Sequence, residues 1–466
     1  METGTADLGE PFSSWDVVVT PHRDEERVLI VAFDSPVLGR RTECMVWVPD
    51  HYRGAGNPLP VCWFLHGTVT PFTHPLLKRL VARAEDRGRR PLISSGRERA
   101  VGPKTMGFDE LLDDARFLVV APDAGKPPWC PSCNWVDGPR SPGLAAETHL
   151  HDEAMPLIEA LFSTRTDRAG RAVIGHSMGG GGAAIQGFRH PDRFGFVGCS
   201  SGVLSLMQDH MSRRRVRWLI YNRSQGFRPL PADEIHYRNN NLLDLAPNVA
   251  GSGIELVVVI GTGTESGEEY LPYAPDEIGS RSDVTMETVQ RRVNDEIAHR
   301  LTEAGVPFTY VTTTGYHSIG RSTFRRFFRE RMETVFEQGV PEPETFSYKN
   351  ADPAFSVWGY DVETERPNTE FLHLLRSRTD GRDFTIAGTG TAHVTTPARF
   401  EPGTTVGVTS TAGGEPPVSK QRTVRADGRI EITLALGVPR RDNETSRAVA
   451  RGAFPFPHTR VEIRTP

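Results

Sequence analysis

A serine stands at the centre of a glycine-rich segment, Gly175-His-Ser177-Met-Gly179. The segment Arg171-Ala-Val-Ile174, a predicted strand, precedes it, and an Ala- and Gly-rich stretch with helical spacing follows. This order is typical of a nucleophile elbow, where a strained turn between strand and helix projects the serine hydroxyl above a sheet. A side chain at either glycine would collide with neighbouring backbone. The pattern predicts that Ser177 is a nucleophile, the alternative being a glycine-rich helix start that binds phosphate or only packs.

A serine hydroxyl needs a base to take its proton, and that base is usually a histidine oriented by an acid. With this elbow the chain order is serine, acid, histidine. His317 is the best-placed base, because it lies in a loop after the predicted strand 307–312 and before the last helix of this region. The acids that qualify by position are Glu265, Glu268, Glu269, Asp276, Glu277, Asp283 and Glu287. The residues alone leave that choice open.

The oxyanion formed at the attacked carbonyl needs two backbone N–H donors aimed at it in advance. The residue after the nucleophile, Met178, supplies one of them. The second is expected from the loop that leaves an early strand, at Leu65-His-Gly67-Thr68.

The elements that must position these residues alternate between short apolar runs and helical stretches from about residue 16 to 335. Such alternation predicts an α/β fold with a mostly parallel central sheet. The predicted strands are 16–20, 28–33, 43–48, 60–66, 117–121, 171–175, 196–200, 216–220, 255–260 and 307–312. The predicted helices are 145–162, 177–189, 284–303 and 321–337.

After residue 345 the composition changes. Thr, Gly and Pro become frequent, and apolar residues alternate with polar ones at 384–386, 406–408 and 429–434. We therefore expect two domains, an α/β-hydrolase domain over 1–345 and a smaller all-β domain over 346–466. The second domain could bind carbohydrate, cover the active site or mediate assembly, and its residues favour none of these.

Charge and composition exclude several classes of protein. The net charge is −5 with 37% hydrophobic residues, which gives no general attraction for nucleic acid or anionic lipid. No apolar run approaches the ~20 residues of a membrane span. The first residues have neither the basic start nor the apolar stretch of a secretory signal, so we expect a cytoplasmic location.

No metal or cofactor is expected. Cys130 and Cys133 form a CxxC pair without the second pair of ligands that zinc requires. His149 and His151 are two apart on a predicted helix and point to different faces. The expected partner is a small-molecule ester, with no nucleic acid and no membrane span, and the residues leave the oligomeric state open.

With these motifs the chain resembles the Putative esterase family of α/β-hydrolases, in particular its mycolyltransferase branch of mycobacterial secreted antigens, and also its esterase D branch. The resemblance covers roughly 45–335 and is carried by 65–67, 129–135, 147–157, the elbow, 237–239, 260–264 and 315–318. It implies that the acid is Glu287, with Glu265 and Asp276 as alternates, and that the second oxyanion donor is Thr68.

Two departures from the mycolyltransferases affect the expected substrate. Their trehalose-contacting Asp is replaced here by His66, and the Trp two residues after the catalytic His is replaced by Ile319. The resemblance thus implies a serine esterase that lacks the trehalose contacts. An acyltransferase with the same covalent mechanism is the first alternative, and an inactive scaffold that acts as a binding protein is the second.

Overall fold

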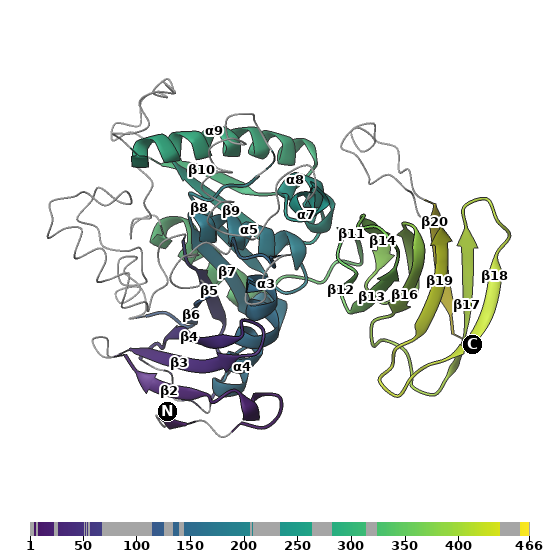
Figure 1. Cartoon of the computed structure of the whole chain (residues 1–466), viewed down its shortest axis with the longest axis horizontal. Helices are drawn as coiled ribbons and strands as arrows, with labels where there is room; N and C mark the ends of the chain where they lie inside the picture. The colour runs from purple at the N-terminus through teal and green to yellow at the C-terminus, as the bar shows by residue number, and fades with distance from the viewer. Residues whose placement is uncertain are drawn as a thin grey trace, which may run out of the picture.

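The computed structural model describes residues 4–5, 8–22, 27–50, 52, 54, 56–67, 114–124, 134–138, 144–205, 207, 234–262, 282–313, 324–438 and 457–465. A ten-stranded sheet organises the part before residue 340 (Figure 1). In spatial order its strands are β1 (Gly4–Thr5), β2 (Val18–Pro21), β3 (Val28–Ser35), β4 (Arg40–Trp47), β6 (Leu118–Pro122), β5 (Val61–Leu65), β7 (Arg171–His176), β8 (Phe196–Ser200), β9 (Glu255–Gly261) and β10 (Thr309–Thr313). The predicted strand 216–220 lies outside the described residues.

The strands from β6 to β10 pair in parallel, whereas β1 to β4 pair antiparallel and β4 joins β6 antiparallel. This mixed order with a parallel centre is the predicted α/β-hydrolase architecture, which is confirmed. The central strands are apolar throughout because both faces of the sheet are covered. Trp63 and Leu65 pack into the core on one face, and Cys62 and Phe64 pack into the core on the other.

Helices cover the two faces. On the Trp63 face lie α3 (Ala146–Thr148), the π-helix η2 (His149–Ala154), α4 (Met155–Leu161), α5 (Met178–Arg189), α8 (Leu242–Val249) and α9 (Ser282–Glu303). On the Phe64 face lie the π-helix η4 (Phe324–Arg329) and α11 (Glu330–Gln338). The short elements η1 (Phe12–Ser14), η3 (Arg168–Gly170) and α7 (Glu234–Arg238) complete this part. Among the described residues no helix is long and apolar enough to cross a membrane.

The described residues after 344 form two antiparallel sheets, so the predicted all-β character is confirmed (Figure 1). The six-stranded sheet is β11 (Thr345–Asn350), β14 (Leu372–Arg378), β15 (Asp383–Ala387), β20 (His458–Arg464), β17 (Thr405–Ala412) and β18 (Val418–Thr423). The four-stranded sheet is β12 (Ala354–Val357), β13 (Tyr360–Glu365), β16 (Gly390–Thr395) and β19 (Glu431–Gly437). Their inner faces enclose a separate apolar core. We call this part the β-sandwich.

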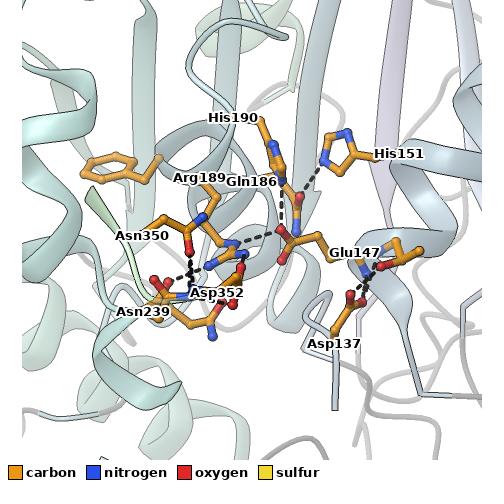
Figure 2. A network of polar contacts seen from close by, with 12 residues as sticks. Asp137, Glu147, His151, Gln186, Arg189, His190, Asn239, Asn350 and Asp352 are labelled. Carbon is orange, nitrogen blue, oxygen red and sulfur yellow. Dashed lines mark hydrogen bonds and ion pairs between the residues drawn. The ribbon is translucent and has the colours of Figure 1, made fainter. Parts of the chain in front are cut away.

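A buried polar network joins the β-sandwich to the end of α5 (Figure 2). Arg189, the last residue of α5, donates from Nε to Glu147 at 2.8 Å and from Nη2 to Asp352 of the β-sandwich at 2.5 Å. The carboxamide of Asn239 also donates to Asp352, at 3.0 Å. His190 bonds the same Glu147 oxygen at 2.8 Å. The helix that begins after Ser177 therefore ends in an ionic contact with the β-sandwich.

Candidate active site

Ser177 occupies the turn between β7 and α5, as the elbow pattern predicts. Its backbone has φ 58° and ψ −123°, a conformation that costs free energy for a residue with a side chain. The turn is held from both directions, because the N–H of Ser177 donates to the carbonyl of Ser200 at 2.9 Å and its own carbonyl accepts from Gly181 at 3.0 Å. The strain is therefore sustained by the surrounding backbone, which is typical of a functional residue.

The glycines on either side of Ser177 are required by the packing of the backbone. A Cβ at Gly175 would lie 2.2 Å from the carbonyl oxygen of Gly179, and a Cβ at Gly179 would lie 1.9 Å from that of Leu65. Gly180 is equally constrained, with 2.5 Å to the carbonyl oxygen of Ser200. Only glycine lets α5 begin this close to the ends of β5 and β8.

The close approach of Gly179 brings the exit of β5 beside the start of α5. Met178 is the first residue of that helix, and the first N–H groups of a helix point out of it with partial positive charge. Thr68, the other expected oxyanion donor, lies outside the described residues. Gly67 is the last described residue before Thr68. Because Gly179 lies against Leu65, strand β5, which leads toward Thr68, ends next to Met178 at the start of α5.

His66 fixes the exit of β5. Its ring is fully buried, with Nδ1 2.9 Å from the carbonyl of Gly67 and Nε2 3.8 Å from Asp123. Burial lowers the pKa of His66 from its ordinary value, against the opposing effect of Asp123. Because a carbonyl can only accept, Nδ1 carries a proton. The indole of Trp135 donates to the backbone carbonyl of His66 at 3.1 Å, so this segment is held on both sides.

Glu287 lies at the ends of β8 and β9, and β8 is the neighbour of β7, the strand that leads to Ser177. Its side chain has no exposed surface. Its Oε1 accepts from the hydroxyl of Ser201 at 2.7 Å and from the N–H of Gly261 at 2.6 Å. Two turns further along α9, Asn294 donates to the carbonyl of Gly202 at 2.7 Å. The buried face of α9 thus holds a carboxyl group at the edge of the sheet where β7 delivers Ser177.

Sequence reasoning missed Ser201, which holds this carboxyl group in place. It follows β8 directly and has a positive φ of 46°. Small polar residues just past the end of a parallel strand point to the functional edge of an α/β sheet, and that signal could have identified it.

His317, Glu265 and Asp276 lie outside the described residues, so no distance joins them to Ser177. The strand before His317 is described. It is β10, which runs parallel to β9 with Thr313 opposite Gly261. The segment that carries His317 therefore starts at the same edge of the sheet as Ser177 and Glu287.

The described cysteines are not competing nucleophiles. Cys44, Cys62 and Cys199 are buried free thiols. Burial raises the pKa of Cys199 to about 12, and it raises the pKa of the other two further. A thiol must lose its proton to react, so these side chains have a structural role. Cys130 and Cys133 lie outside the described residues.

The two histidines at 149 and 151 have separate partners. His149 Nδ1 bonds Glu153 at 2.7 Å, whereas His151 Nε2 bonds Gln186 at 2.8 Å. The prediction that their side chains diverge is confirmed.

A family of known proteins matches the region of the chain that contains Ser177. The family described as Putative esterase matches residues 35–271, slightly more than half of the chain. Esterase MT1326 and Esterase Rv1288, from two strains of Mycobacterium tuberculosis, are each 28% identical over 194 residues, which is 41% of this chain and 36% of theirs. The match thus spans little more than a third of the length of these relatives.

Two solved structures were found to align with about two thirds of this chain. An S-formylglutathione hydrolase from Agrobacterium tumefaciens aligns with 68% of this chain and 98% of its own, at 16% identity and a TM-score of 0.45. MPT51 of Mycobacterium tuberculosis aligns with 66% of this chain and 96% of its own, at 16% identity and a TM-score of 0.44.

Proposed function

The chain belongs to the Putative esterase family, and from this premise we propose that it is a serine esterase that cleaves a carboxylic ester or thioester through an acyl-enzyme. Ser177 is the nucleophile, His317 the general base, and Glu287 the acid that orients His317. The N–H groups of Met178 and Thr68 hold the oxyanion. The observation that carries the proposal is the strained backbone of Ser177, because nothing in simple packing requires a non-glycine residue at φ 58°.

In the first half of the reaction, Ser177 Oγ attacks the carbonyl carbon while His317 takes the hydroxyl proton. The tetrahedral oxyanion accepts hydrogen bonds from Met178 and Thr68. When the intermediate collapses, the bond to the alcohol or thiol breaks and the leaving group takes the proton from His317. Water then repeats the sequence on the acyl-enzyme and releases the carboxylic acid.

Placement at the sheet edge favours Glu287 over the two alternate acids. A fully buried carboxyl group is costly unless hydrogen bonds compensate for lost hydration, and Ser201 and Gly261 supply two. Glu265 and Asp276 remain alternates whose surroundings the described residues do not include.

The direct test is hydrolysis of p-nitrophenyl acetate and butyrate by the wild-type protein and Ser177→Ala. We expect a loss of kcat/KM of about 10⁴-fold or more in the variant. Retained activity would contradict the proposed nucleophile. Adding a simple alcohol in excess separates hydrolysis from acyl transfer: a hydrolase releases mainly the free acid, whereas an acyltransferase gives the alcohol's ester in preference to acid.

We also propose that residues 1–345 and 346–466 are separate domains. In support, β11 begins at Thr345, and among the described residues no later strand joins the ten-stranded sheet. Limited proteolysis tests this boundary, since stable fragments that end near residue 345 are expected and early cleavage within either sheet would contradict it.

A further inference from the structure

The segment Asn134-Trp135 lies between the two stretches of backbone that lead to the expected oxyanion donors. The N–H of Asn134 donates to Sδ of Met178, the first residue of α5, at 3.3 Å. The indole Nε1 of Trp135 donates to the backbone carbonyl of His66, at the exit of β5, at 3.1 Å. These two residues therefore connect the start of α5 to the exit of β5.

The backbone of this segment adopts a conformation that is unusual for a tryptophan. Asn134 and Trp135 have φ values of 50° and 56°. Asn visits this left-handed region fairly often, but a bulky residue such as Trp rarely does. Strained conformations of this kind persist only where the surrounding structure holds them, and they cluster at functional sites. The segment is therefore kept in place by its contacts at some cost in free energy.

A further contact fixes the segment to α5. The carbonyl of Trp135 accepts a hydrogen bond from Nε2 of Gln186 at 2.5 Å, and Oε1 of Gln186 bonds Nε2 of His151 at 2.8 Å. Neither Trp135 nor Gln186 has any exposed surface. Buried polar networks whose groups are bonded to one another make their surroundings rigid. The indole thus reaches His66 from a firmly held backbone.

The glycine run at the start of α5 makes room for this indole. A Cβ at Gly182 would lie 2.6 Å from Cδ1 and 2.7 Å from Cβ of Trp135. On its other side the indole packs edge-on against the ring of His66, with ring centres 4.9 Å apart and planes at 62°. The indole is therefore confined between α5 and the residue whose carbonyl it bonds.

The hydrogen bond to His66 acts on the peptide units next to the second expected donor. Nε1 of Trp135 holds the carbonyl of the unit between His66 and Gly67. The His66 ring, on which the indole packs, holds the carbonyl of the following unit, with Nδ1 2.9 Å from the Gly67 oxygen. Because a peptide unit is planar, a hold on its carbonyl also restricts the direction of its N–H. In the sequence, the N–H of that second unit belongs to Thr68.

We propose that Trp135 is a positioning residue for the oxyanion hole, because its indole N–H holds the exit of β5 at a fixed spacing from Met178. The inference rests on the proposed esterase activity. Oxyanion donors act in the transition state and must be in place before the charge develops. A looser exit of β5 would therefore weaken transition-state binding and leave substrate binding nearly unchanged. The effect should fall on kcat and spare KM.

The test is Trp135→Phe in the full chain, with Trp63→Phe as the matched control. Trp63 is a fully buried residue of β5 in the same apolar core, and its Nε1 has no hydrogen-bond partner among the described residues. Both substitutions remove the same atoms from the core, so both should lower stability through lost packing. Only Trp135→Phe also removes a hydrogen bond to the exit of β5. Placing 3-benzothienylalanine at position 135, which keeps the ring shape and has sulfur in place of the N–H, gives a second variant with little loss of packing.

The measurement is kcat and KM for p-nitrophenyl acetate and butyrate, with the folded active sites counted by fluorophosphonate labelling of Ser177. We expect kcat per labelled site to be about 10–100-fold lower in both Trp135 variants than in Trp63→Phe, with KM within about threefold. A variant that only loses packing has fewer folded sites, but each site keeps its kcat. Should Trp135→Phe fail to fold, the benzothienyl variant decides the point.

Two results would overturn the inference while leaving the esterase proposal intact. The first is a kcat per labelled site in the Trp135 variants within about twofold of Trp63→Phe, which would make Trp135 a packing residue only. The second is a higher KM at unchanged kcat, which would place its effect on substrate binding. A wild-type chain that is neither active nor labelled would overturn the esterase proposal and this inference together.

Discussion

The hydroxyl of Ser201 donates a 2.7 Å hydrogen bond to Oε1 of Glu287. The residue before Ser201 is Ser200, whose carbonyl accepts a hydrogen bond from the N–H of Ser177. Two consecutive residues at the end of β8 therefore hold the candidate nucleophile and the candidate acid. The spacing between these two groups is set by the end of one central strand.

Replacing Glu287 by Gln tests whether this carboxyl group is the triad acid. The amide keeps the size and an oxygen for Ser201 and Gly261 but cannot stabilise a protonated His317. We expect kcat to fall by about 10²–10⁴-fold, with the melting temperature changed far less than the activity. Ser201→Ala, which removes one hydrogen bond from the same carboxyl group, should cost only about 1 kcal/mol of stability. Full activity in Glu287→Gln would instead transfer the role to Glu265 or Asp276.

Gly179→Ala should damage both stability and activity. The added Cβ would lie 1.9 Å from the Leu65 carbonyl oxygen, so either α5 or the exit of β5 has to move. We expect an unfolding free energy lower by about 1–3 kcal/mol or more, measured by urea denaturation. A Cβ at Gly56 has nothing within 4 Å, and Gly56→Ala should stay within ~0.5 kcal/mol of the wild type. Equal effects of the two substitutions would refute this reading of the elbow.

Arg189→Gln should destabilise the chain strongly. The Arg189 side chain is 7% exposed, and removal of its guanidinium leaves the buried Glu147 without its main ionic partner. Breaking a buried ion pair from one side costs about 3–5 kcal/mol. Arg460→Gln removes an exposed pair with Asp383 and should cost no more than about 1 kcal/mol. Chemical denaturation measures the unfolding free energy of both variants. A loss in Arg189→Gln no larger than the loss in Arg460→Gln would mean that the network in Figure 2 contributes little to stability.

The folded protein should lose stability as pH falls below about 6.5, the ordinary pKa of histidine. His151 and His190 have ring centres 3.9 Å apart, and burial, together with Arg189 and Arg193, holds the pKa of each well below that value. Below pH ~6.5 the unfolded chain binds protons that the folded chain does not, so each residue lowers the unfolding free energy by up to about 1.4 kcal/mol per pH unit. Glu147 and Asp352 lie beside these histidines. Both acids are present in the wild-type protein and in the His190→Gln and His299→Gln variants described next.

His190→Gln keeps an N–H donor for Glu147 but does not titrate. The slope of unfolding free energy between pH 7.5 and about 5.5 should therefore be smaller in this variant. His299→Gln, at a side chain that is 75% exposed, should leave the slope unchanged. A slope in His190→Gln equal to that of the wild type would contradict the assignment.

Much of the fold could be predicted from the sequence because its signals are local. The apolar run at 61–65 and the alternation at 429–434 each indicate how many faces of a strand are buried, and the structure agrees at both places. The positive φ of Ser177 was also predictable, since only a strained turn needs glycines at 175 and 179 together.

Other features depend on contacts between distant segments and had no such signal. The bond from Ser201 to Glu287 joins residues 86 apart, and the bond from Arg189 to Asp352 joins residues 163 apart. In the sequence Arg189 is only a cation near a helix end, and nothing nearby indicates a partner in the β-sandwich.

The most direct test of the central claim, that Ser177 is the nucleophile, is intact-mass and peptide mapping of the full chain after treatment with a small fluorophosphonate. The account predicts one phosphonyl adduct per chain, located on Ser177 and absent from Ser177→Ala. An unlabelled wild-type chain, or an adduct on another residue, would contradict it.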